Sequence, residues 1–315
     1  MPEEIFINET SIVPGEKKQV IFSKYELPSQ SIIETPAYVF RSLHEGPTIL
    51  LSAGMHGEET NGIETLRQLI KLDIVQNPLR GSIIVIPVLN IVSFIFSQRD
   101  LPDGRDLNRC FPGTRKGSLG SRIAFDIMQN ILPVIDLGVD FHTGGAKINN
   151  YPQIRCVFDE PKNIELARLF APPFIINSPY REGSFRMEAA RLGKNILVFE
   201  AGESQRFNNT AINEGLYGCQ RLLKNLNMIK AELPQPHTII IGKDKWLRAS
   251  EAGMFRTHKK FGSFFEKDEI IGIISDPYNK NEISVIAPEN GFIIGINNKP
   301  VVHVGEALLH IGLEK

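Results

Sequence analysis

Apolar residues before position 233 fall into short continuous runs that alternate with stretches of helical periodicity. The runs that we interpret as buried strands, or as a helix end leading into one, are Thr48–Gly54, Gly81–Asn90, Leu137–Gly144, Ala167–Asn177 and Asn195–Gly202. Between and after them, helical periodicity is found over 61–72, 121–131, 185–192 and 213–227. Strands without polar alternation are covered on both faces. The pattern therefore predicts an α/β fold with a mixed, mostly parallel sheet flanked by helices.

The pattern changes after the segment Leu233–His237. From there on, short β-rich runs separated by Gly, Pro and Asn replace the alternation of strands and helices. We therefore expect two domains, residues 1–236 with the α/β fold and residues 237–315 as a small all-β sandwich or barrel.

Composition narrows the class of protein. The chain has 315 residues, with 35 basic and 36 acidic side chains and a net charge of −1, so it lacks the basic excess of proteins that bind nucleic acids or membrane surfaces. No apolar run approaches the roughly 18 residues of a spanning helix, and the first residues lack the apolar segment of a signal peptide. Three cysteines without paired spacing suit a reducing compartment. We expect a soluble, cytoplasmic protein, and we leave open whether it forms a homo-oligomer.

Three residues at the ends of predicted strands can share a divalent metal ion. His56 and Glu59 follow the first buried strand, flanked by Gly54 and Gly57, which allow a tight turn and close backbone approach. His142 ends another buried strand. The carboxyl ends of strands are where open α/β sheets bind ligands, and three protein ligands plus water form the usual catalytic zinc site. Zinc suits this mixed nitrogen and oxygen set, although manganese or cobalt can also occupy one.

The same His-x-x-Glu spacing recurs at His303 and Glu306 in the β-rich tail. Because this second pair lies in the β-rich tail, we interpret it as structural. No possible metal-binding partner stands at a recognisable spacing from the remaining histidines, which are His44, His237, His258 and His310.

A carboxylate ends the last buried strand. Glu200 stands directly after an apolar run, where it can take a proton from water near a metal ion. Glu203 is its rival, but it follows Gly202 and we expect it to be more solvated. We therefore favour Glu200.

The long loop over residues 91–120 is rich in Gly and Pro and carries charged side chains. Connections of that length without secondary structure usually have a function. Arginine is suited to bidentate binding of carboxylates and to stabilising a polarised carbonyl oxygen. The candidates in this loop are Arg99, Arg105, Asp106, Asn108 and Arg109.

The order of these motifs resembles the succinylglutamate desuccinylase/aspartoacylase family, which is related to the zinc carboxypeptidases. The resemblance is carried by HGEE, DGRDLNRCFPG, DFHTG and VFEAG, and extends to APENGFIIG and VGEALLHIG in the tail. It implies one zinc ion per chain and hydrolysis of a small N-acyl amino acid or similar amide. The roles it implies are zinc binding by His56, Glu59 and His142, general base catalysis by Glu200, polarisation of the carbonyl by Arg99 (or Arg105), substrate carboxylate binding by Asn108 and Arg109, and orientation of a zinc-bound imidazole by Asp106.

Two other functions remain open at this point. A zinc carboxypeptidase would use the same metal site on peptides, and it differs in needing an open cleft. A non-catalytic module that binds a small ligand is the alternative from another class. A carrier role for the tail is disfavoured because Lys280 and Lys299 lack the sequence context of a modified lysine. Trp246 is expected in a core or an interface.

Overall fold

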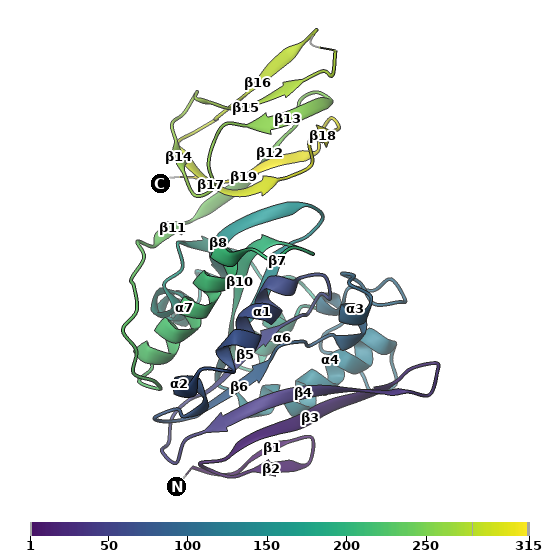
Figure 1. The fold of residues 1–315 in the computed structure, drawn as a ribbon, viewed down its shortest axis with the longest axis vertical. Helices are drawn as coiled ribbons and strands as arrows, with labels where there is room; N and C mark the ends of the chain where they lie inside the picture. The colour runs from purple at the N-terminus through teal and green to yellow at the C-terminus, as the bar shows by residue number, and fades with distance from the viewer. Residues whose placement is uncertain (1, 279, 314–315) are drawn as a thin grey trace.

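A long mixed β-sheet runs through the molecule, and helices cover both faces of its central part (Figure 1). The computed structural model describes residues 2–278 and 280–313. Along the main sheet, each strand hydrogen-bonds to the next in the spatial order β12-β19-β17-β8-β10-β7-β5-β6-β4-β3. The four central strands β10, β7, β5 and β6 are parallel to one another, while the strands towards either edge are antiparallel. This confirms the predicted fold class.

The strands have the following bounds: β1 Ile5–Ile7, β2 Thr10–Ile12, β3 Lys17–Glu26, β4 Ile32–Arg41, β5 Thr48–Ala53, β6 Ser82–Ile86, β7 Leu137–Gly144, β8 Ile148–Cys156, β9 Phe174–Asn177, β10 Asn195–Glu203, β11 Ile239–Ile241, β12 Lys243–Arg248, β13 Gly253–Thr257, β14 Phe264–Phe265, β15 Ile270–Ser275, β16 Glu282–Ile286, β17 Gly291–Asn297, β18 Val301–Val302 and β19 Ala307–Leu313. The helices are α1 Thr60–Leu69, α2 Asp73–Gln76, α3 Ile91–Ile95, α4 Leu119–Asn130, α5 Pro161–Phe170, α6 Phe185–Arg191 and α7 Asn209–Asn225, with short 3-10 turns at Leu107–Arg109 and Leu132–Val134.

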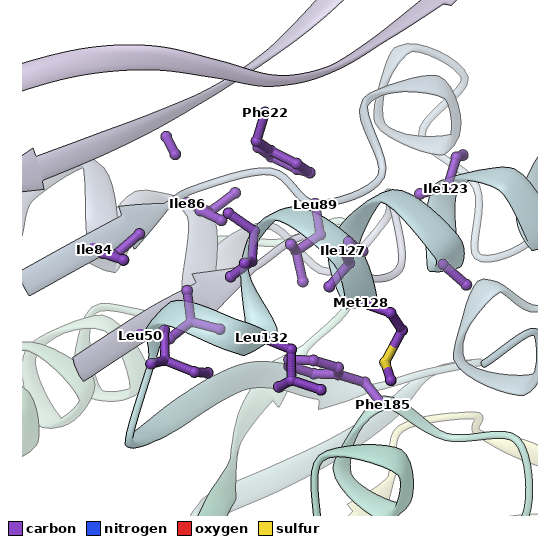
Figure 2. Packing of buried hydrophobic residues seen from close by; sticks show 14 of the residues in the cluster. Phe22, Leu50, Ile84, Ile86, Leu89, Ile123, Ile127, Met128, Leu132 and Phe185 are labelled. Atoms are coloured by element: carbon purple, nitrogen blue, oxygen red, sulfur yellow. The ribbon is translucent and has the colours of Figure 1, made fainter. Parts of the chain in front are cut away.

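Alternation along the central strands supplies two separate cores. Leu50 packs on the face covered by α4 and α6, whereas Ile49 and Leu51 pack on the face covered by α1, α5 and α7. Figure 2 shows the first of these cores, where Leu50 of β5 lies near Leu132 and Phe185. Both faces of β5 are buried, because side chains point alternately to opposite faces and helices cover each face. This explains the continuous apolar run in its sequence.

The segment after residue 236 continues the main sheet. Strand β17 pairs with β8 of the α/β region, and β19 and β12 extend the sheet beyond it. A second sheet of β16, β15, β13 and β18 lies outside this extension, at the end of the molecule where Figure 1 shows yellow and pale green strands. The all-β unit predicted for residues 237–315 is thus joined edge to edge with the α/β sheet.

Sequence patterns missed one strand that matters for the site. Strand β8 was not expected, because its sequence INNYPQIRC carries two Asn and a Pro, which are depleted in strands. Its pairing with β10 shifts register between the partners of Glu200 and Gly202. Pro152 lies in β8 between the two partners, Gln153 and Asn150, an irregularity of the kind where strands tolerate proline.

Deleting the side chain of Leu50 tests the core between β5 and the α4/α6 layer. Leu50 is fully buried, so we expect Leu50→Ala to lower the free energy of unfolding by about 2–5 kcal/mol. Leu43, which is 64% exposed, gives the matched control, and Leu43→Ala should change it by less than about 0.5 kcal/mol. Urea unfolding measures both, and equal effects would mean that the assigned core is wrong.

Candidate functional site

A tight turn between β5 and α1 brings His56 and Glu59 together. Gly54 has a left-handed backbone with φ of +64°, and a Cβ atom on Gly57 would lie 2.0 Å from the carbonyl carbon of Ser93. Only glycine therefore fits at Gly57, as the close approach expected from the sequence requires. Glu59 precedes the first residue of α1, and its side chain makes no capping hydrogen bond. Its carboxylate is thus free to turn towards His56.

The carboxylate of Glu59 lies between two imidazole rings. Its Oε1 is 2.8 Å from Nδ1 of His56, and its Oε2 is 2.9 Å from Nδ1 of His142. All three side chains are buried, and one ligand atom from each lies within 4.8 Å of the others. His142 arrives from the end of β7, the strand beside β5, because the carboxyl ends of parallel strands share one edge of the sheet.

Two further carboxylates hold the outer nitrogens of the rings. Nε2 of His56 is 3.0 Å from Oδ1 of Asp106, and Nε2 of His142 is 2.8 Å from Oδ2 of Asp140. Ser52 donates to Asp140 at 2.7 Å. The family resemblance implied such a place for Asp106, whereas nothing in the sequence analysis pointed to Asp140. The available signal was its spacing two residues before His142 on a strand, which puts both side chains on one face.

The donor set suits a divalent cation. Burial alone would lower the pKa of both imidazoles, yet Asp140 and Glu59 raise the pKa of His142 well above its usual value, and Glu59 and Asp106 raise that of His56. Each ring faces carboxylates at both nitrogens, so only two imidazolium ions would satisfy all four contacts. A cation between the two Nδ1 atoms and Glu59 would satisfy them with neutral rings. Imidazoles whose second nitrogen bonds a carboxylate are the usual arrangement of metal ligands.

The long loop after α3 brings Arg99 and Asp106 to the same place. Nη1 of Arg99 is 3.3 Å from Oε1 of Glu59, and its Nη2 donates to Asp106 at 2.8 Å. Arg105 is exposed and contacts Asp103 and Ser118 instead. Of the two arginines considered for the carbonyl, the structure thus brings Arg99 to the histidine pair.

Glu200 faces the same space from the end of β10. Its Oε2 accepts a hydrogen bond of 2.9 Å from Asn150, and its Oε1 lies 3.7 Å from Nη1 of Arg155. The expectation that Glu203 is the more solvated of the two glutamates is wrong. Glu203 is 5% exposed and accepts a hydrogen bond from Asn298. Glu200 lines the cavity that contains His56 and His142, whereas Glu203 does not.

A cavity of about 280 Å³ joins these groups. Its wall is rich in arginine side chains and is therefore strongly cationic. The sequence analysis did not predict its arginines from β8 and from the segment around α6, or the aromatic side chain from β12. No motif connects these segments to the histidines. The lining residues that bear on the argument are Arg99, Asn108, Arg109, Arg155, Arg181, Arg186, Glu200 and Trp246.

Other predictions from the sequence have simpler outcomes. His303 is exposed, and the carboxylate of Glu306 accepts its backbone N–H and pairs with Lys299. This second His-x-x-Glu pair closes a turn in the tail.

In the described part of the chain, no helix is both long enough and apolar enough to cross a membrane.

Comparison with known proteins agrees with this architecture. Residues 45–226 match the model of the succinylglutamate desuccinylase/aspartoacylase catalytic domain. N-alpha-acetyl-L-2,4-diaminobutyric acid deacetylase of Halomonas elongata is 29% identical over 200 residues, a region that spans 61% of this chain and 58% of that relative.

Solved structures share the whole fold. The product-bound ectoine utilization protein EutE (DoeB) of Ruegeria pomeroyi superposes with a TM-score of 0.82 at 20% identity, covering 96% of this chain and 98% of that one. A succinylglutamate desuccinylase/aspartoacylase of Rhodobacter sphaeroides gives 0.82 at 23% identity, with 95% of each chain covered. Because the family model matches more than half of the residues, the chain belongs to the succinylglutamate desuccinylase/aspartoacylase family.

Proposed function

We propose that this protein is a zinc-dependent deacylase that hydrolyses the amide bond of a small N-acyl amino acid. The observation that carries the proposal is the position of Glu59 between two imidazoles, in a cavity that a second carboxylate, Glu200, also lines. One zinc ion would be held by the Nδ1 atoms of His56 and His142 and by a carboxylate oxygen of Glu59. When bound, zinc supplies an acidified water molecule and polarises a carbonyl group.

Glu200 carries the protons in this reaction. Its Oε2 is engaged by Asn150, which leaves Oε1 to accept a proton from the attacking water. The water oxygen then forms a bond to the acyl carbon, and the carbon–nitrogen bond breaks as Glu200 returns the proton to the leaving nitrogen. The products are a carboxylate and a free amine.

The arginine-rich wall binds and polarises the substrate. Arg99 stands beside Glu59, where its guanidinium can stabilise the negative charge that develops on the carbonyl oxygen. Asn108 and Arg109 line the cavity and would hold the carboxylate of the substrate. Oδ1 of Asn108 accepts from the backbone of Phe185, which fixes its side-chain amide.

The size of the cavity favours a small substrate over a peptide. About 280 Å³ lies near the lower limit of roughly 300 Å³ for small-molecule pockets. Trp246, from the segment after residue 236, forms part of its wall, so that segment narrows the space. The Halomonas relative is a deacetylase of an N-acetylated diamino acid, which makes N-acetyl amino acids the first substrates to assay. Release of amino acids from peptide C-termini instead would indicate the carboxypeptidase alternative.

We expect purified protein to bind about one equivalent of zinc, because three protein ligands typify a catalytic site. The His56→Ala/His142→Ala double variant should bind none, whereas His303→Ala in the tail should bind as the wild type does.

Zinc affinity should fall as pH is lowered from about 8 to about 5.5, since protons compete for the imidazoles and their pKa values are raised without metal. Elemental analysis measures the zinc content, and competition with a chelator measures the affinity. Wild-type protein without affinity for any divalent metal would refute the proposal.

Replacing Glu200 tests the assignment of the base. Glu200→Gln keeps the hydrogen bond with Asn150 within reach but removes the basic oxygen, so kcat should fall by about 10²–10⁴-fold with zinc content unchanged. Glu203→Gln is the matched control, because Glu203 lies outside the cavity, and it should retain most of the activity. Release of amine from N-acetyl and N-succinyl amino acids measures both variants. A reversal of the two results would exchange the roles of the glutamates.

A further inference from the structure

Unpartnered polar groups gather at the wall of the cavity and behind it. In the described part of the chain, six buried side-chain atoms lack a hydrogen-bond partner, and five of them belong to four neighbouring residues. They are Oδ1 of Asn150, both amide atoms of Gln153, Nε of Arg155 and Nδ1 of His310. Buried polar atoms usually have a protein or water partner, so such a cluster indicates a built polar site. None of these atoms belongs to the proposed metal ligands.

Strand pairing places two of these residues, Asn150 and His310, in one row across the sheet with Gly295 and Trp246. Trp246 of β12 stands opposite His310 of β19, His310 stands opposite Gly295 of β17, and Gly295 stands opposite Asn150 of β8. Directly opposed residues of antiparallel strands point to the same face. Asn150 in turn donates to Glu200. The row therefore leads from the C-terminal segment to the proposed base along the face that carries the cavity.

His310 is held firmly in one orientation. Its Nε2 bonds the carboxylate of Asp244, and its ring stacks on Trp246 with 4.6 Å between centroids and 7° between planes. A carboxylate only accepts, so Nε2 carries the proton. Burial lowers the pKa of His310, which favours the neutral ring. Its buried Nδ1 is consequently a fixed acceptor with no partner.

The side chains of His310 and Asn150 flank Gly295. A Cβ atom there would lie 2.9 Å from Cβ of His310 and 3.1 Å from Oδ1 of Asn150. The amide nitrogen of Asn150 is committed to Glu200, so Oδ1 is its acceptor end. A water molecule has two O–H groups and can donate to both acceptors, Nδ1 of His310 and Oδ1 of Asn150. Gln153 is fully buried and stands directly opposite Glu200 in the pairing of β8 with β10.

We propose that His310 is a positioning residue for Glu200, which it orients through an ordered water molecule and the amide of Asn150. The proposal rests on the proposed function, because it takes Glu200 as the base. Its consequence is that the segment after residue 236 does more than narrow the cavity. Through Asp244, Trp246 and His310, this segment fixes the direction of the carboxylate that handles the proton.

Kinetics of His310 variants test this role. His310→Phe keeps a ring against Trp246 but removes Nδ1, and kcat should fall about tenfold or more while KM changes less than about twofold, in the range found when partners of site residues are removed. His310→Asn places an oxygen near the position of Nδ1 and should recover part of the loss. His303→Asn, on the exposed surface of the same segment, is the control and should behave as the wild type.

Gly295→Ala tests the same link by displacing the two side chains beside the glycine. Its backbone is outside the left-handed region, but the added methyl group would lie 2.9 Å from Cβ of His310 and 3.1 Å from Oδ1 of Asn150, so these side chains must shift. We expect the same fall in kcat with zinc content and KM unchanged. Unaltered kcat in both His310→Phe and Gly295→Ala would overturn the proposal. A rise in KM alone would mean that His310 serves substrate binding instead.

A double-mutant cycle gives a readout that does not depend on activity. Trp246 is the only tryptophan of the chain, so its fluorescence reports unfolding in urea. If the row links them, the shifts in the urea midpoint caused by His310→Phe and Glu200→Gln should be non-additive in the double variant. Additive shifts would contradict the link. Non-additive shifts in a protein that hydrolyses no amide would leave the link intact and refute the proposed function.

Discussion

The carboxylate of Glu59 between two imidazole rings is the contact on which the rest of the site depends. It requires that α1 begin close to the ends of two neighbouring strands. Gly62 makes this possible further along α1, where a Cβ atom would lie 2.5 Å from Cβ of Phe141 on β7. Close packing of the helix on the strand and close packing of the turn at Gly57 thus fix the three side chains before any ion is bound.

Much of this could be predicted from the sequence. Continuous apolar runs identified the central strands, and the bounds of β7 agree with those predicted. The meeting of His56 with His142 followed from a general property of parallel sheets, since both lie at strand ends on one edge. The place of Arg99 depended on the family resemblance, because spacing alone did not distinguish it from Arg105.

The rest could not be predicted because it depends on register between distant strands. Asn150 and Arg155 lie on β8, whose composition is unlike that of a strand and which is held by pairing with β10, β9 and β17. His310 reaches the same face through pairing of β19 with β17, and its sequence neighbourhood holds no metal-like spacing. The solvation of Glu203 was misjudged because its partner, Asn298, comes from the far end of the chain.

Anomalous diffraction at the zinc absorption edge from crystals of the zinc-loaded protein would locate the metal ion among these side chains. We expect one peak between Nδ1 of His56, Nδ1 of His142 and the carboxylate of Glu59, with both Nε2 atoms still on Asp106 and Asp140. No peak at these residues, or a peak on the Nε2 side of either ring, would contradict this expectation.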